Sequence, residues 1–242
     1  RQSKQAYMAP EQNPLSAYPD LIDEGRTAMN AFAPSGMGVP FNLTTALNQI
    51  KESNPEMSSI ANIARLLGSK TLQGFEIEFM SWKDFRPYAS PAKGVLNKAV
   101  IVHEKKKILI SDAFNNNTTH SAMDTLMADI LHEAVHAVTR PALDLGYAYS
   151  TGKSGLIQDT IRKHGLPEDF NLSGEALGKI WSDFNDKLLP YLREQGKKDL
   201  DLLYGLSSID EFFSELASDR KFMDFLDSVQ MPKDMLPPKS KL

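Results

Sequence analysis

Two histidines and a glutamate stand in the order His-Glu-x-x-His, at His132, Glu133 and His136. Residues four apart lie on one face of an α-helix, about one turn from each other, so two imidazoles can occupy adjacent corners of a tetrahedral metal site. Glu133 is rotated round the helix from His132, and its carboxylate can take a proton from a water instead of binding the ion. The pattern predicts a zinc site with a general base beside it.

A second interpretation of this pattern involves no metal. His132 and His136 would then be partly buried histidines, satisfied by hydrogen bonds on an ordinary core helix. The apolar residues around them favour the metal, because a helix that is apolar on most sides must compensate the polar groups that it buries. Asp129 shares the stripe of the two histidines, where an acid either orients an imidazole or is solvated, and we expect a solvated acid.

A third metal ligand is expected on a second helix. Glu211 and Glu215 are four residues apart, so they share one stripe of a predicted amphipathic helix. One such carboxylate would complete three protein ligands and leave the fourth position to water. The stretch from Ser208 to Glu211 is also a capping-box sequence, in which Glu211 reaches back to the backbone of Ser208 and Glu215 becomes the ligand. The apolar positions that predict this helix are Ile209, Phe212, Phe213 and Leu216.

Composition limits the classes of protein. The chain has 242 residues, 41% hydrophobic and 24% charged, which is enough to bury a sizeable core. A net charge of -4 gives no electrostatic reason to expect nucleic acid or an anionic membrane surface as a partner. The sequence contains no cysteine, so a metal must be held by histidine and carboxylate. It has no apolar run of membrane-spanning length and begins at Arg1, which indicates a processed product or a fragment of a longer chain.

The elements that must position these residues are mostly helices. The His-Glu-x-x-His helix is expected to begin after an N-cap at Ser121 and to end before Pro141. Two helices broken near Asn54 are expected within residues 43–67, the second capped by Ser58 or Ser59. Further helices are predicted over residues 21–32, 154–164 and 173–195, with a kink at Pro190 in the last.

A small number of strands completes the predicted fold. Residues 75–79 alternate with period two, and residues 98–103 and 108–111 flank a charged turn as in a hairpin. The fold class is therefore α+β: a mostly helical domain with a small mixed sheet and an active-site helix. We expect a Pro-rich extended arm over residues 1–40, the domain over 41–230 with a helical insert at 141–203, and a Pro-rich tail over 231–242.

The His-Glu-x-x-His run and the stretch that contains Glu211 resemble the zincin metallopeptidases whose third ligand is glutamate. The run from His132 to Thr139 is similar to the thermolysin helix. The stretch from Tyr204 to Glu215 resembles the catalytic domain of anthrax lethal factor, in which a tyrosine lies seven residues before a Glu-Phe-Phe-x-Glu run. The resemblance implies that Glu211 binds zinc, that Glu215 is a supporting acid one turn later, and that Tyr204 donates to the oxyanion. It covers residues 98–140 and 204–226.

Two alternatives accompany this resemblance. Residues 214–219 also resemble the thermolysin-type Asn-Glu-x-x-Ser-Asp run, on which Glu215 would bind the metal and Asp219 would support it. Tyr204 could instead be a core tyrosine at the entrance of a helix, with Tyr147 or Tyr149 as substitute donors.

The function implied is that of a zinc endopeptidase acting on a protein or peptide. Zn²⁺ is the expected cofactor, and an extended substrate would pair with the edge of the sheet at strand 108–111 or at its hairpin partner. Similar domains occur in secreted bacterial toxins and large phage proteins, which implies a secreted, host-delivered or virion-associated chain with contacts to a larger polypeptide or assembly. The alternative is a catalytically silent zincin-like module that binds other proteins. Retention of Glu133 favours catalysis, because a metal-only site needs no base.

Overall fold

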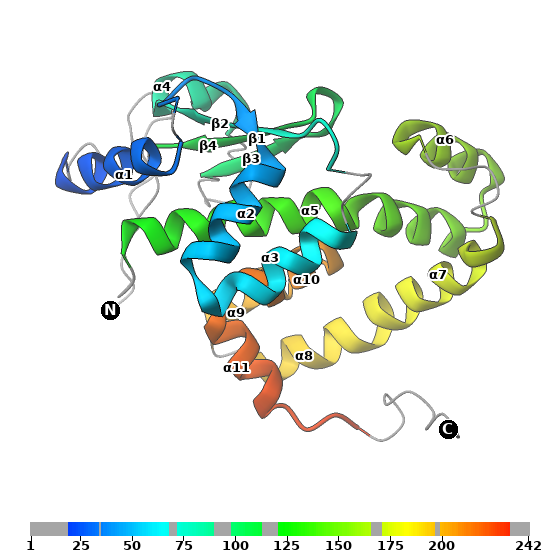
Figure 1. Cartoon of the computed structure of the whole chain (residues 1–242). Coiled ribbons are helices and arrows are strands. Elements are labelled where there is room, and N and C mark those ends of the chain that lie inside the picture. Colours follow the sequence, from blue (N-terminus) through cyan, green and yellow to red (C-terminus); the bar gives the residue numbers. More distant parts are fainter. Residues whose placement is uncertain are drawn as a thin grey trace. The chain divides into compact units, whose positions relative to one another are not determined.

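The fold is α+β, as predicted, with helices dominating and one small mixed sheet (Figure 1). The chain divides into two compact units, residues 1–137 and 138–242, and the boundary falls inside the longest helix, α5 (Ala122–Ser150). The computed structural model describes residues 19–33, 35–67, 72–89, 98–112, 121–165, 171–196 and 199–232. Residues 1–18 of the expected arm and 233–242 of the expected tail lie outside these ranges.

The first unit begins with helix α1, which agrees with the helix predicted at residues 21–32. Met29 and Phe32 on α1 are buried, so this part of the segment expected as an extended arm contributes to the core. Phe32 packs against Phe79 of the sheet with ring centroids 6.4 Å apart. The helices that precede the sheet are α1 (Pro19–Phe32), α2 (Leu43–Ser53) and α3 (Pro55–Leu67).

Asn54 joins α2 to α3 and corrects the predicted start of α3. Its backbone N–H donates to the carbonyl of Ile50 (2.9 Å), and its side-chain Oδ1 accepts from the N–H of Met57 (3.2 Å). Pro55 follows at the first helical position, where no N–H is needed. The predicted cap at Ser58 or Ser59 is therefore wrong, because Asn54 and Pro55 already form the helix start.

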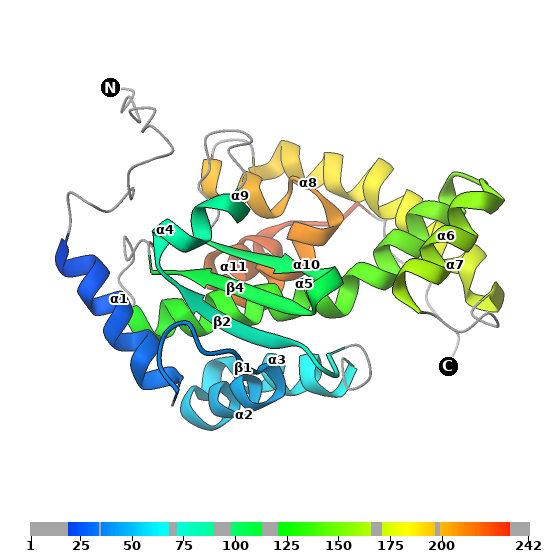
Figure 2. The same cartoon turned by 90° about the horizontal axis from the view of Figure 1, so that it is seen from above.

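The sheet has the order β1-β2-β4-β3, with β2 and β4 parallel and the outer pairs antiparallel. The predicted hairpin is confirmed, and its turn closes with Lys106 at φ 49°. Strand β4 is interior and buried, whereas β3 lies at an edge. The sheet lies over the N-terminal part of α5 (Figures 1 and 2). The strands are β1 (Phe41–Asn42), β2 (Glu76–Met80), β3 (Ala99–Val102) and β4 (Lys107–Ser111), and the short helix α4 (Trp82–Phe85) follows β2.

Helix α5 begins as predicted and ends later than predicted. The hydroxyl of Ser121 accepts from the N–H of Asp124 (3.1 Å) and donates to its carboxylate (2.7 Å). The predicted end before Pro141 is wrong, since the helix continues to Ser150. A proline removes one backbone hydrogen bond but does not forbid continuation where packing compensates the loss. Beyond it, Leu145 and Ala148 are fully buried.

In the second unit, α5 continues against α7 at two glycines. A Cβ on Gly178 would lie 2.9 Å from that of Tyr149, and a Cβ on Gly146 would lie 3.2 Å from the carbonyl oxygen of Leu177. The helix predicted over residues 173–195 is continuous from α7 through a widened π turn at Phe184–Leu188 into α8. This turn accommodates Pro190, whose ring would clash with the carbonyl four residues earlier in a regular helix. The helices here are α6 (Ser154–His164), α7 (Asn171–Asp183) and α8 (Leu189–Gly196).

The second unit ends in three short helices that pack with α8. Helix α10 is predicted by its apolar spacing, but α9 and α11 are not. Within the described part of the chain, none of the helices has both the length and the apolarity to cross a bilayer. The helices are α9 (Leu200–Gly205), α10 (Ile209–Ser218) and α11 (Arg220–Ser228). Their shared core is Leu189, Leu192, Leu202, Leu206, Ile209, Phe212 and Phe222.

Candidate metal centre

The two histidines of α5 point their ring nitrogens at each other. Nε2 of His132 lies 3.0 Å from Nε2 of His136, and the ring centroids are 4.7 Å apart at 75°. Two nitrogens bound to one tetrahedral zinc at about 2.0–2.1 Å are about 3.3 Å apart, so the observed separation is within a few tenths of an ångström of that expected for a chelating pair. Both side chains are half-buried.

Glu211 supplies the third candidate ligand. One ligand atom from each of His132, His136 and Glu211 lies within 4.8 Å of the others. Two imidazoles and one carboxylate are a usual donor set for a catalytic zinc, because three protein ligands leave a position for water. Glu215, the competing candidate, is not a member of this group. The residues therefore fit the ion that the sequence predicts.

Glu133 lies between the two histidines in sequence but on another side of α5. It is 9% exposed, and Ala134 and Ala137 next to it are buried almost completely. A largely buried carboxylate on the same helix as a chelating pair suits a group that accepts a proton and passes it on.

Glu215 and Asp219 each have a defined place in the second unit. The Cβ and Cγ of Glu215 lie 2.9 Å from where a side chain on Gly205 would begin, so Glu215 covers the last residue of α9. Oδ1 of Asp219 accepts from the N–H of Phe222 at 3.0 Å and caps α11. In the thermolysin-type alternative Asp219 supports a ligand at Glu215, and here its Oδ1 caps a helix.

No protein-family model, curated protein or solved structure matches this chain. The likeness to the zincins rests on the His-Glu-x-x-His run and on the residues from Tyr204 to Glu215.

Tyr204 is a surface residue at the end of α9. It is 40% exposed, so the interpretation as a core tyrosine is wrong. The substitute Tyr147 is 48% exposed and rests on Trp181 with ring centroids 5.2 Å apart, whereas Tyr149 is half-buried.

Asp129, one turn before His132 on α5, is half-buried with its Oδ2 atom shielded from solvent, so the expectation of a solvated acid is wrong. Its Oδ2 atom has no hydrogen-bond partner among the described residues. Burial raises the pKa of Asp129, although the positive charge of Lys98 and the imidazole of His132 act in the opposite direction. The sequence shows the position of this acid on the helix but not what covers it.

An ion-pair network around Arg140 was not anticipated from the sequence. Arg140 contacts Asp210 through Nη1 (2.7 Å) and Asp144 through Nε (2.9 Å). Asp144 also accepts from Lys163 and His164, each at 2.9 Å. Burial alone would raise the pKa of Asp144, but the hydrogen bonds from His164 and Lys163 and the charge of Arg140 hold it well below its ordinary value. The spacing of Arg140 after His136 is visible in the sequence, whereas its pairing with Asp210 is not.

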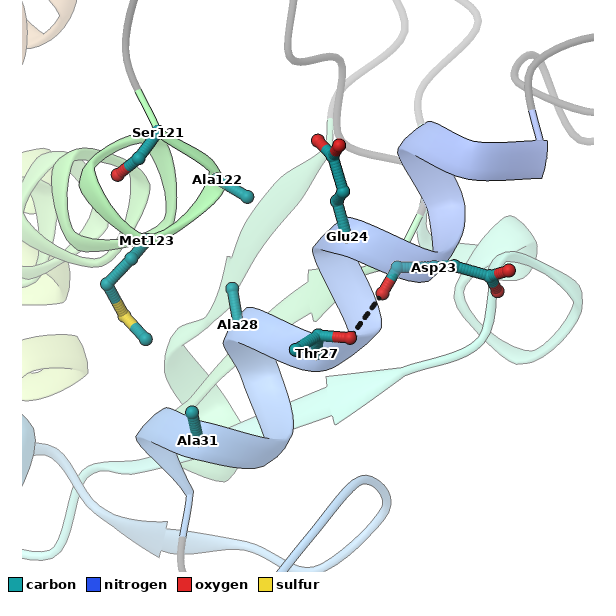
Figure 3. Close-up of a pocket in the computed structure, with 8 residues that line it drawn as sticks. All are labelled: Asp23, Glu24, Thr27, Ala28, Ala31, Ser121, Ala122 and Met123. Carbon is teal, nitrogen blue, oxygen red and sulfur yellow. Dashed lines mark hydrogen bonds between the residues drawn. The ribbon is translucent and has the colours of Figure 1, made fainter.

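A separate hollow of about 650 Å³ lies between α1 and the start of α5 (Figure 3). Asp23 and Glu24 are among the residues that line it, and Thr27 donates to the carbonyl of Asp23 at 2.7 Å. Its α5 residues end at Met123, nine residues before His132, which is about 13 Å along a helix axis. This hollow is therefore distinct from the candidate metal centre.

Proposed function

We propose that the chain is a zinc-dependent endopeptidase with a zincin-like active site. The observation that carries the proposal is the grouping of His132, His136 and Glu211, with one ligand atom of each within 4.8 Å of the others. Glu133 adds the base that hydrolysis needs and that a structural zinc site does not. The fold supports the proposal through the small mixed sheet over the N-terminal part of α5, the helix that carries the His-Glu-x-x-His run.

Each residue has a defined role in this proposal. His132, His136 and Glu211 hold the ion, which when bound lowers the pKa of water toward about 7 and polarises a carbonyl. Glu133 accepts the proton of the attacking water and passes it to the nitrogen of the leaving amine. Tyr204 donates its phenolic O–H to the carbonyl oxygen as negative charge develops there. Glu215 supports the end of α9, which carries Tyr204.

Substrate pairing along the sheet is proposed for β3 alone. The expectation that β4 forms the edge is wrong, since β4 lies between β2 and β3. Its hairpin partner β3 has β4 on one side and ends the described sheet on the other. Main-chain hydrogen bonds from Ala99–Val102 to an extended peptide would give affinity with little dependence on peptide sequence.

Zinc content tests the ligand set. Elemental analysis after dialysis is expected to find about one zinc per wild-type chain, as a single three-ligand site requires. Glu211→Ala is expected to lose the metal, and Glu215→Ala to keep most of it. Loss of zinc in Glu215→Ala alone would identify Glu215, one turn further along α10, as the third ligand. A wild type that takes up no zinc would refute the proposal.

Cleavage tests the enzymatic role. Wild type and Glu133→Gln are incubated with casein and with a peptide library, with zinc and with a chelator. We expect zinc-dependent cleavage by wild type and none by Glu133→Gln, although both bind zinc. Zinc binding without cleavage by either protein would favour the silent protein-binding module instead.

A further inference from the structure

Arg140 continues the line of the two histidines along α5. It lies four residues after His136 and eight after His132, so the three side chains rise on one face with about 6 Å between successive turns. Its guanidinium lies one turn beyond His136 and always carries a positive charge.

Arg140 reaches the first turn of the helix that carries Glu211. Nη1 donates to Oδ2 of Asp210 at 2.7 Å, and Asp210 immediately precedes Glu211 on α10. The Asp210 side chain is 18% exposed and that of Arg140 is 43%, so the pair is partly shielded from water. Charge-assisted hydrogen bonds of this kind are stronger than neutral ones and restrict geometry.

A second carboxylate, that of Asp144, also binds the Arg140 guanidinium. Nε donates to Oδ1 of Asp144, one turn further along α5. The other oxygen of Asp144 accepts from Lys163 and from His164, whose side chain is 7% exposed, at the end of α6. The guanidinium is thus fixed on one side by Asp144 and offers its other side to Asp210.

We propose that Arg140 and Asp210 are positioning residues that set Glu211 as the third metal ligand. This inference rests on the proposed zinc site. The cap at Ser208 fixes the local conformation of α10, but it does not fix the distance of α10 from α5. The contact between Arg140 and Asp210 ties the first turn of α10 to the part of α5 that belongs to the second unit, one residue before Glu211 in sequence.

The test is zinc affinity, measured by competition with a chromophoric chelator on the full chain. Loss of a residue that orients a metal ligand typically costs about 10–100-fold in metal affinity, and we expect at least about tenfold for Arg140→Gln and for Asp210→Asn. Arg140→Lys keeps the charge that Asp210 requires and is expected to restore most of the affinity. Asp159→Asn removes an acid from an exposed pair with Arg162 on α6 and is the matched control with unchanged affinity.

The double variant separates positioning from general destabilisation. If the pair acts as a unit, Arg140→Gln with Asp210→Asn binds zinc about as weakly as either single variant. Single variants that match the wild-type affinity, or losses that multiply in the double variant, would overturn the inference while leaving the zinc site in place. A wild type without zinc affinity would overturn the proposed function and this inference with it. Circular dichroism of each variant verifies that the helices are retained.

Discussion

The hydroxyl of Ser208 accepts a hydrogen bond from the backbone N–H of Glu211 at 3.1 Å. Ser208 is therefore the N-cap of α10 and Glu211 is its third residue. The sequence left Glu211 with two competing roles, in a helix cap or as a metal ligand. The Ser208 cap engages the backbone nitrogen of Glu211, and one carboxylate oxygen of Glu211 belongs to the group with His132 and His136 that could hold a metal ion.

Removing the cap is expected to destabilise the protein. Ser208→Ala leaves the N–H of Glu211 without its acceptor, and loss of an N-cap typically costs about 1 kcal/mol. For a chain of this size the unfolding temperature should fall by roughly 2–4 °C. Thermal unfolding of the zinc-free protein measures this fall. Ser208→Asp supplies another N-cap and should stay near wild type, so an equal fall in both variants would contradict the capping role.

The sequence predicted elements whose signals are local. The hairpin of β3 and β4 follows from two apolar runs around a charged turn, and α10 follows from the spacing of its apolar residues. The parallel pairing of β2 with β4 joins segments about thirty residues apart and has no local signal. Pro141 misled the prediction for α5, because the burial of Leu145 beyond it depends on tertiary packing.

In the candidate site, too, the features with a local sequence signal were predictable and those that depend on distant contacts were not. The spacing of His132 and His136 is a property of one helix, so their convergence was predictable. Glu211 was chosen by resemblance to a family, and its grouping with the histidines depends on how the chain folds. The pairing of Arg140 with Asp210 and the shielding of the Asp129 Oδ2 atom depend on the folded structure, which one sequence does not reveal.

Gly205 should tolerate no side chain. A Cβ there would lie 2.7 Å from Cε2 of Phe222, which is buried, and 2.9 Å from the Cβ of Glu215. Gly205→Ala is expected to cost about 1–3 kcal/mol, as overpacking of a close-packed site does. Gly155→Ala on α6 is the matched control, since nothing lies within 4 Å of its Cβ position and a helical alanine should stabilise by about 0.4–1 kcal/mol. Urea unfolding compares the two, and similar losses in both would refute the packing argument.

The shielded carboxyl of Asp129 should make stability depend on pH. Its pKa is raised in the folded protein by burial, with Lys98 and His132 opposing the shift. Between the pKa of this carboxyl in the unfolded chain, about 4, and its raised pKa in the folded protein, the unfolded chain binds fewer protons, so stability falls as pH rises through this window. Asp129→Asn cannot ionise, and we expect this fall to be smaller in the variant.

The measurement is urea unfolding of the zinc-free protein in a chelator, from about pH 4 to about pH 7. The chelator matters because a bound cation near His132 would itself favour the ionised carboxyl. Identical pH profiles for wild type and Asp129→Asn would show that Asp129 ionises as readily in the folded protein as in the unfolded chain.

Tyr204 should affect turnover without affecting the metal. Tyr204→Phe removes one donor to the developing oxyanion, which typically lowers kcat by about 10²–10³, while KM and zinc content stay close to wild type. Tyr147→Phe is the matched control, because Tyr147 is similarly exposed and its ring rests on Trp181. Steady-state cleavage of a peptide identified with the wild type gives both constants. A loss of kcat in Tyr147→Phe alone would show that Tyr147 on α5 is the donor to the oxyanion. Unchanged kcat in both variants would show that neither tyrosine is that donor.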